Sequence, residues 1–340
     1  MSAAGSRKAA PGLHASDFRA ASWLPNGHAQ TIWAPLFRKP PALPLLRERW
    51  ELPDGDFLDV DRLPKMLGMP TLLVLHGLEG SSESTYARGL LAQAHARGWS
   101  GLALNFRSCS GELNRLARSY HSGETGDLAF AVEKLRVEAP GAPLLIAGVS
   151  LGGNVLVKWL GEMGERAPKE VRAAAAISAP FDLALCAETL DGPGFWARIY
   201  CRRFLRTLLP KAHDRAARFP QALDARSLAG IRTLVAFDDR VTAKLHGFTG
   251  AADYYARSSS NQFVSKVGVP LLLINAEDDP FIPPAALPRE AVSASAHVRF
   301  EISPRGGHVG FVEGSPLAPR FWAEERAVQF LEEILRAQAA

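Results

Sequence analysis

The stretch Gly148-Val-Ser-Leu-Gly152 decides the fold that this sequence predicts. It has the pattern G-x-S-x-G, follows an apolar run at residues 143–149 and precedes a helical pattern at residues 153–160. A strand, a sharp turn and a helix in this order are the setting of a nucleophile elbow, whose strained turn lifts a serine hydroxyl above the sheet. We therefore predict that Ser150 is a nucleophile and that the two glycines leave room for close backbone packing. The alternative is a glycine-rich turn whose serine only caps the helix.

Short apolar runs alternate with helical patterns from about residue 70 onward. The runs lack polar alternation, so they predict strands that are buried on both faces, as in a parallel sheet. They lie at residues 71–75, 101–106, 143–149, 171–178, 269–275 and 298–302. Apolar residues recur at helical spacing in three further segments, at residues 85–96, 125–137 and 320–338. This order of strands and helices predicts a doubly wound α/β fold with a mostly parallel central sheet and helices on both faces.

Two other segments depart from this alternation. In residues 47–60 polar and apolar residues partly alternate around Pro53-Asp-Gly55, which predicts an antiparallel hairpin. Beyond Pro180 the alternation of predicted strands and helices stops. Residues 195–209 have a helical pattern, and only residues 233–237 resemble a further strand.

We interpret the segment without this alternation as an insertion. The predicted core comprises residues 1–180 and 265–340, of which 1–45 form an N-terminal extension, and residues 181–264 form a helical cap. Such a cap would cover the carboxyl edge of the sheet, where open α/β sheets bind ligands.

A serine needs a base and an orienting acid to become a nucleophile. In this kind of fold the acid follows the serine in the chain, and the histidine follows the acid. The apolar run at 269–275 ends in Ala276-Glu-Asp-Asp-Pro280, which puts an acid at the carboxyl end of a predicted strand. Asp278 and Asp279 are both candidates. We favour Asp279 for its place in the loop before the proline, with Asp278 as the residue that caps the turn.

The predicted base is His308, in the segment Arg305-Gly-Gly-His-Val-Gly310. This segment follows the last predicted strand, and its glycines permit a tight loop that presents an imidazole. His76, His121 and His246 are the competing histidines.

An oxyanion hole requires two main-chain N–H groups near the nucleophile. The first predicted donor is Leu151, the residue after the serine. The second is expected from His76-Gly-Leu-Glu-Gly80, the loop after the apolar run at 71–75, and we assign it to Leu78. We interpret the His76 side chain as a structural group that bonds to the loop backbone.

Together these residues resemble the α/β-hydrolase fold, and more narrowly the AB hydrolase 4 family of YheT-like hydrolases. The resemblance spans residues 26 to 311. Besides the elbow, the His308 loop and His76-Gly-Leu-Glu-Gly80, it is carried by Asn26-Gly-His-Ala-Gln-Thr-Ile32, Asn105-Phe-Arg-Ser-Cys-Ser-Gly-Glu112, Tyr120-His-Ser-Gly-Glu-Thr-Gly-Asp127, Phe237-Asp-Asp-Arg-Val-Thr-Ala243 and Asn275-Ala-Glu-Asp-Asp-Pro-Phe281. The family's N-F-R-G-C-S-G pattern has Ser108 in place of a glycine here. The resemblance implies a serine hydrolase of ester or acyl-lipid substrates.

Composition limits the classes of partner. The chain has 340 residues, a net charge of +4 and 47% hydrophobic residues, which excludes a disordered or fibrous protein. The charge excess is small, so no nucleic-acid partner is expected. Four arginines at helical spacing favour a solvated helix face over one that meets anionic lipid or substrate; they are Arg198, Arg202, Arg203 and Arg206.

The chain has three cysteines without C-x-x-C spacing and no apolar run of about 20 residues, which predicts a soluble cytoplasmic protein. We expect a monomer or homodimer. The pair Asp238-Asp239 lacks metal ligands at a suitable spacing, so neither a metal nor a cofactor is predicted.

The sequence thus predicts a hydrolase of short, medium or lipid-like carboxylic esters that acts through an acyl-enzyme intermediate. Two alternatives remain open at this stage. In one, an alcohol replaces water and the chain is an acyltransferase. In the other, the fold is a binding module without turnover.

Overall fold

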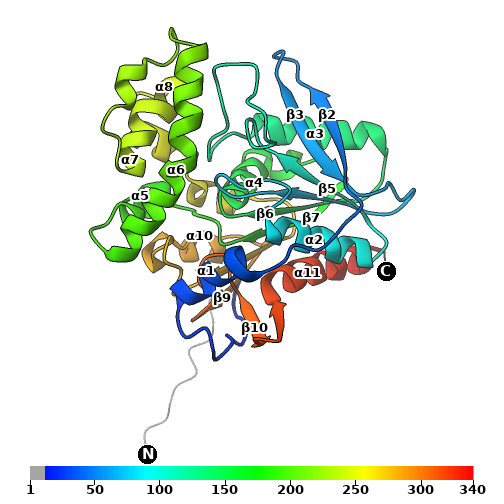
Figure 1. Ribbon diagram of the computed structural model, residues 1–340. Coiled ribbons are helices and arrows are strands. Elements are labelled where there is room, and N and C mark those ends of the chain that lie inside the picture. Colours follow the sequence, from blue (N-terminus) through cyan, green and yellow to red (C-terminus); the bar gives the residue numbers. More distant parts are fainter. Residues whose placement is uncertain (1–11, 340) are drawn as a thin grey trace, which may run out of the picture.

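The centre of the computed structural model, which describes residues 12–339, is a nine-stranded sheet (Figure 1). The strand order is β1-β9-β8-β7-β6-β4-β5-β3-β2, and every neighbouring pair is parallel except β3 with β2 and β3 with β5. The strands are β1 (Leu13–Ala15), β2 (Leu46–Glu51), β3 (Phe57–Arg62), β4 (Thr71–Leu75), β5 (Ser100–Asn105), β6 (Leu144–Val149), β7 (Val171–Ile177), β8 (Leu271–Ala276) and β9 (Val298–Ser303). A separate hairpin joins β10 (Val312–Ser315) to β11 (Ala318–Phe321).

The α/β-hydrolase fold and its mostly parallel sheet are confirmed. All six predicted runs form the parallel strands β4 to β9, and all residues of β5, β6 and β8 are buried. Helices cover both faces, and each face has its own apolar core. On one face lie α2 (Thr85–Ala96) and α11 (Trp322–Ala339), and on the other α3 (Gly126–Glu138), α4 (Leu151–Met163) and α10 (Arg289–Ser293).

The hairpin and the three predicted helices lie where the sequence indicated, to within two residues. Strands β2 and β3 form the hairpin, and Gly55 takes φ +85° in its turn. The N-terminal extension adds two elements: strand β1, which pairs with β9, and helix α1 (Gly27–Phe37). Asn26 caps α1, because its side chain accepts a hydrogen bond from the N–H of Ala29 at 2.9 Å.

Residues 181–264 are fully described and have no strand. Their elements are α5 (Leu183–Leu190), α6 (Phe195–Arg218), η2 (Ala225–Leu228), α7 (Leu234–Phe237), the π-helical turn η3 (Asp238–Thr242), α8 (Ala243–His246), α9 (Ala251–Ser258) and the start of η4 (Ser260–Lys266). Apolar clusters hold these helices together in one group beside the sheet (Figure 1). We propose that this group is the predicted cap, with the boundaries given above.

The strand predicted weakly at 233–237 was wrong, because these residues form α7. Thr233 caps the helix through a 3.1 Å bond from the N–H of Ala236 to its hydroxyl. Asp191 accepts the N–H groups of Leu234 and Val235 at 2.7 and 2.8 Å. These bonds satisfy the first N–H groups of a helix, and they outweigh the strand preference of a short apolar run.

Candidate active site

Ser150 stands between the end of β6 and the start of α4, in a strained turn. Its φ of +52° and ψ of −120° are rare for a residue with a side chain. The neighbouring glycines make the turn possible. A Cβ at Gly148 would lie 2.4 Å from the carbonyl oxygen of Gly152, and one at Gly152 would lie 2.6 Å from that of His76. The turn therefore has the geometry of a nucleophile elbow.

The loop after β9 brings His308 to Ser150. The Nε2 atom of His308 lies 2.9 Å from the Ser150 hydroxyl, and its Nδ1 atom lies 2.8 Å from a carboxylate oxygen of Asp279. The other oxygen of Asp279 accepts the N–H groups of Phe281 and Ile282 at 2.8 and 3.2 Å. The carboxylate thus binds Nδ1–H and leaves Nε2 free to accept the serine proton.

Asp278 has a different place. Its carboxylate accepts the N–H of Gly307 at 2.9 Å, so it fixes the loop that carries His308 and does not contact the imidazole. The structure therefore places Asp279, the favoured acid, against the histidine and Asp278 in a turn. Their chemical roles stay predictions.

Three side chains that the sequence did not assign support the His308 loop. Thr31 accepts the N–H of His308 at 2.9 Å, and Ser178, which follows β7, accepts the N–H of Val309 at 3.0 Å. Gln30 binds the main chain of Val312 with both ends of its amide, at 2.8 and 3.2 Å. The segment Asn26 to Ile32 carried the family resemblance, but only the structure shows that it holds this loop.

The predicted oxyanion donors Leu78 and Leu151 border the same cavity as Ser150. Within residues 12–339, neither N–H donates to a protein acceptor. Gly77 passes close to the serine, since a Cβ there would lie 3.0 Å from that of Ser150. Both residues thus border the cavity with N–H groups that no described protein atom accepts, and their role as donors stays a prediction.

Within residues 12–339, none of the three competing histidines bonds to Ser150 or Asp279, although His121 lines the same cavity. His76 is buried beneath the loop; its Nδ1 bonds to the carbonyl of Gly77 at 2.7 Å, and its Nε2 accepts the N–H of Phe106 at 3.0 Å. Burial lowers the pKa of His76 to about 4, so it is neutral at pH 7. His121 and His246 lie against each other, with ring centroids 4.4 Å apart, and burial lowers their pKa values to about 3 and about 2.

The loop His76-Gly-Leu-Glu-Gly80, which carries the predicted donor Leu78, is tied to α6 through Glu79. This residue has φ +56°, and its N–H donates to the hydroxyl of Tyr120 at 2.9 Å. Its carboxylate accepts the Tyr120 hydroxyl at 2.8 Å and the ammonium of Lys211, on α6, at 2.9 Å. A group on α6 therefore helps to fix the residue next to Leu78.

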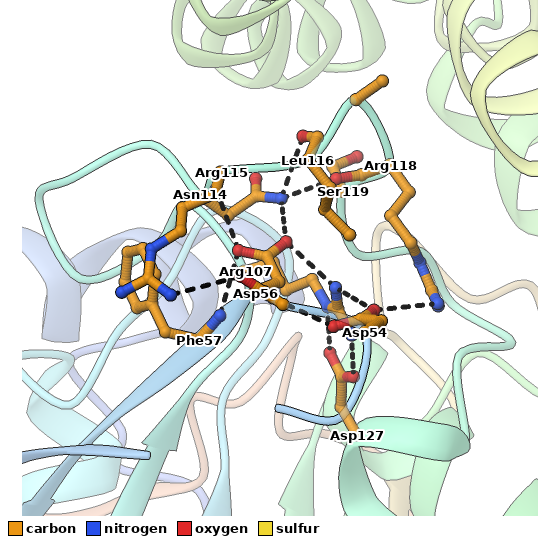
Figure 2. A network of polar contacts seen from close by, with 12 residues as sticks. Asp54, Asp56, Phe57, Arg107, Asn114, Arg115, Leu116, Arg118, Ser119 and Asp127 are labelled. Carbon is orange, nitrogen blue, oxygen red and sulfur yellow. Dashed lines mark hydrogen bonds and ion pairs between the residues drawn. The ribbon is translucent and has the colours of Figure 1, made fainter. Parts of the chain in front are cut away.

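A charge network centred on the buried Arg107 supports the loop that follows β5 (Figure 2). The Arg107 guanidinium bonds to Asp54, Asp56 and Asp127 at 2.8, 2.9 and 2.7 Å. Burial opposes the charge of Arg107, but the bonds to Asp127 and Asp54 prevail and raise its pKa. Asn114, in the same loop, donates to Asp56 and to the carbonyl groups of Leu116 and Arg118.

Ser108, at the position where the family pattern has a glycine, has a left-handed backbone with φ +66°. Its hydroxyl bonds to Asn114 and accepts a bond from Arg215, on α6, at 2.9 Å. Arg215 also donates to three carbonyl oxygens of the loop at 2.8, 2.8 and 3.0 Å; they belong to Leu116, Ala117 and Arg118. The serine hydroxyl thus provides a bond that a glycine lacks, and it holds α6 to the loop.

The cavity above Ser150 and His308 has an apolar side formed by the cap helices. The apolar residues come from α5 to α8 and are Leu183, Cys186, Ala187, Leu190, Phe204, Leu208, Ala212, Leu234, Phe237, Val241 and Leu245. One polar group among them is Asp238, which accepts the hydroxyls of Thr242 and Tyr255, each at 2.7 Å. Burial raises the pKa of Asp238 to about 6.

Comparisons with known proteins show the family of this chain. The family model described as "alpha/beta hydrolase fold" matches residues 70–315, and the chain belongs to this family. The chain is 39% identical over 319 residues to "Putative esterase YheT" of Escherichia coli (strain K12), covering 92% of each chain. It is 30% identical over 301 residues to "Phospholipase ABHD3" of Mus musculus, covering 86% of this chain and 72% of the relative.

A solved structure shares the fold. The esterase Pf2001 of Pyrococcus furiosus superposes with a TM-score of 0.56 at 16% identity, over 86% of this chain and 93% of that one. In residues 12–339, every helix is too short or too polar to cross a bilayer. The absence of a metal and of a cofactor, the oligomeric state and the cellular location stay predictions.

Proposed function

We propose that this chain is a serine hydrolase of carboxylic esters with an apolar, lipid-like acyl group. The observation that carries the proposal is the relay of two hydrogen bonds, 2.9 Å from Ser150 to His308 and 2.8 Å from His308 to Asp279, at the base of a largely apolar cavity. The names of the two relatives, an esterase and a phospholipase, support an ester bond as the target.

In the proposed mechanism Ser150 attacks the ester carbonyl while His308 takes its proton at Nε2. The N–H groups of Leu151 and Leu78 stabilise the negative charge that forms on the carbonyl oxygen. His308 then gives the proton to the leaving alcohol, and an acyl group remains on Ser150. Asp279 orients the imidazole and stabilises its charged form throughout. Water, deprotonated by His308, attacks the acyl-enzyme, releases the acid and restores the hydroxyl.

The apolar side of the cavity supports the choice of substrate. Leu208, Leu234 and Val241 line it without offering polar partners, so an acyl chain loses contact with water when it binds there. We expect turnover of p-nitrophenyl esters to rise from acetate into the medium-chain range.

The test is ester hydrolysis by the wild type, Ser150→Ala and the control Ser227→Ala, which removes a hydroxyl from an exposed turn of η2. We expect Ser150→Ala to lower kcat by about a thousandfold or more, with thermal unfolding unchanged, and the control to be fully active. A fluorophosphonate should label Ser150 in the wild type, as peptide mass spectrometry would show. Equal turnover by Ser150→Ala and the wild type would exclude this nucleophile. Products formed in the presence of added alcohol measure acyl transfer separately.

A further inference from the structure

The outer face of α6 begins with large apolar side chains. Phe195, Trp196 and Ile199 lie in its first two turns and are 71%, 39% and 39% exposed. Large apolar groups that cluster on a surface mark interaction sites more often than isolated ones do.

A basic stripe continues this face along the helix. At about 100° per residue, Phe195, Ile199, Arg202 and Arg206 fall in one row. Arg198 and Arg203 flank this row, and all four arginines are exposed. The opposite face of α6 carries Phe204, Leu208 and Lys211 and lines the cavity above Ser150. We call the outer residues the α6 face; it consists of Phe195, Trp196, Arg198, Ile199, Arg202, Arg203 and Arg206.

The arginines of the α6 face have no acidic partner in the part of the chain that the structure describes. None of them takes part in an ion pair within residues 12–339, and residues 192–210 contain no Asp or Glu. Arg198 donates only to the carbonyl of Pro193, at 2.7 and 3.1 Å. The face therefore has unbalanced positive charge next to an apolar patch.

Three of these arginines also border a hollow on the surface. Arg198, Arg202 and Arg206 line it together with Arg232, which precedes α7. The one acid there, Asp191, already accepts the N–H groups of Leu234 and Val235. Four arginines that line one hollow favour an anion with several oxygens, such as a phosphate group.

We propose that the α6 face docks on the surface of an anionic lipid bilayer. Phe195, Trp196 and Ile199 enter the interface between headgroups and acyl chains, where aromatic side chains are favoured. The arginines contact the lipid phosphates and gain from the negative surface potential. A nucleic acid would use the arginines but gain little from burying Phe195 and Ile199, so the combination favours a bilayer.

The α6 face is connected to the candidate active site by packed rings. The ring centroids are 5.4 Å apart for Phe195 and Trp196, 6.1 Å for Trp196 and Tyr200, 4.7 Å for Tyr200 and Phe281, and 4.3 Å for Phe281 and His308. His28, on α1, stacks on Trp196 at 4.8 Å and bonds to the Tyr200 hydroxyl at 3.0 Å. When the protein is docked on a bilayer through the α6 face, its cavity would thus lie close to the lipid. The docking itself does not depend on catalysis.

The experiment is co-sedimentation of the full chain with vesicles, without an ester substrate. One set of vesicles is pure phosphatidylcholine, and the other contains phosphatidylglycerol in equal parts. The variants are Phe195→Ser with Ile199→Ser, and Arg202→Glu with Arg206→Glu. The apolar control is Leu67→Ser with Leu317→Ser, at residues that are 96% and 98% exposed. The charge control is Lys169→Glu with Lys244→Glu, which changes the net charge equally at exposed sites.

We expect the wild type and both controls to bind the anionic vesicles and to release them as salt is raised. The double arginine variant should lose about thirtyfold or more in partition coefficient, and the double apolar variant about tenfold. All variants should stay folded at the temperature of the assay, because none of the substituted side chains is fully buried. Failure of the wild type to bind, or equal binding by the α6 variants, would overturn the proposal. Binding of DNA in place of vesicles would overturn it too and assign the arginines to another polyanion.

Discussion

The two sides of the cavity are built in different ways. On the sheet side, each functional group is fixed by directional bonds, as when Asp279 binds two main-chain N–H groups and His308. On the cap side, most of the lining is apolar, and two cations, Lys211 and Arg215, link it to the core. Hydrogen bonds hold atoms to a fraction of an ångström, whereas apolar contacts tolerate side chains of similar volume. We infer that the sheet side sets the chemistry and the cap side sets the range of acyl groups.

The largest effect is expected from breaking the charge network of the sheet side. In Arg107→Met the carboxylates of Asp54, Asp56 and Asp127 lose the cation that they share, and the free energy of unfolding should fall by about 3–5 kcal/mol. The matched control is Arg115→Met, whose partner Glu51 is exposed, and it should lower the free energy of unfolding far less. Urea denaturation measures both. Equal costs would show that the buried network is no more important than a surface pair.

The buried carboxyl group of Asp238, on the cap side, should make the free energy of unfolding depend on pH. Burial raises the pKa of Asp238 to about 6, while in the unfolded chain it stays near 4. The folded protein therefore holds this proton more tightly, and the contribution of Asp238 to stability falls as pH rises from about 4 to 6. Asp238→Asn removes the titration, so its unfolding free energy should gain about 2 kcal/mol relative to the wild type between pH 4 and pH 7. If the difference in unfolding free energy between Asp238→Asn and the wild type stays constant from pH 4 to pH 7, the pKa of Asp238 is not raised in the folded protein.

Removing a hydrogen bond that supports the His308 loop should have a smaller effect, and on catalysis. Thr31→Val keeps the shape of the side chain but removes the acceptor for the N–H of His308. We expect kcat for ester hydrolysis to fall about tenfold with KM nearly unchanged, because the base is displaced while the cavity is intact. The control is Thr207→Val, on the exposed side of α6, which should leave both constants unchanged. If KM rises and kcat does not, Thr31 acts on substrate binding instead.

The smallest effect is expected from the apolar lining. Leu208→Ala removes about three carbon atoms from the wall of the cavity, and it should lower kcat/KM for octanoate esters about fivefold while leaving acetate esters unchanged. The ratio of octanoate to acetate turnover measures this selectivity. It does not depend on the fraction of active enzyme in each preparation. Equal losses for both esters would mean that Leu208 positions the catalytic groups and does not contact the acyl chain.

Local sequence signals were sufficient for most of the fold. Buried parallel strands are continuous apolar runs, so the pattern of apolar residues along the chain was enough to find β4 to β9. The elbow was equally local, because G-x-S-x-G between a strand and a helix already encodes the close backbone contacts of Gly148 and Gly152. The helix α7 escaped prediction because its N-terminal bonds come partly from Asp191, far along the chain.

What the sequence by itself determined was the order of strands and helices, the strained turn at Ser150 and a short set of acids and histidines. Only the tertiary structure decided which of them meet. It placed Asp279 and not Asp278 against His308, buried His76 as a neutral support, and brought Thr31 of the N-terminal extension to the His308 loop. The reason is physical: spacing along the chain governs local geometry, whereas hydrogen bonds between distant segments form only when packing brings the segments together.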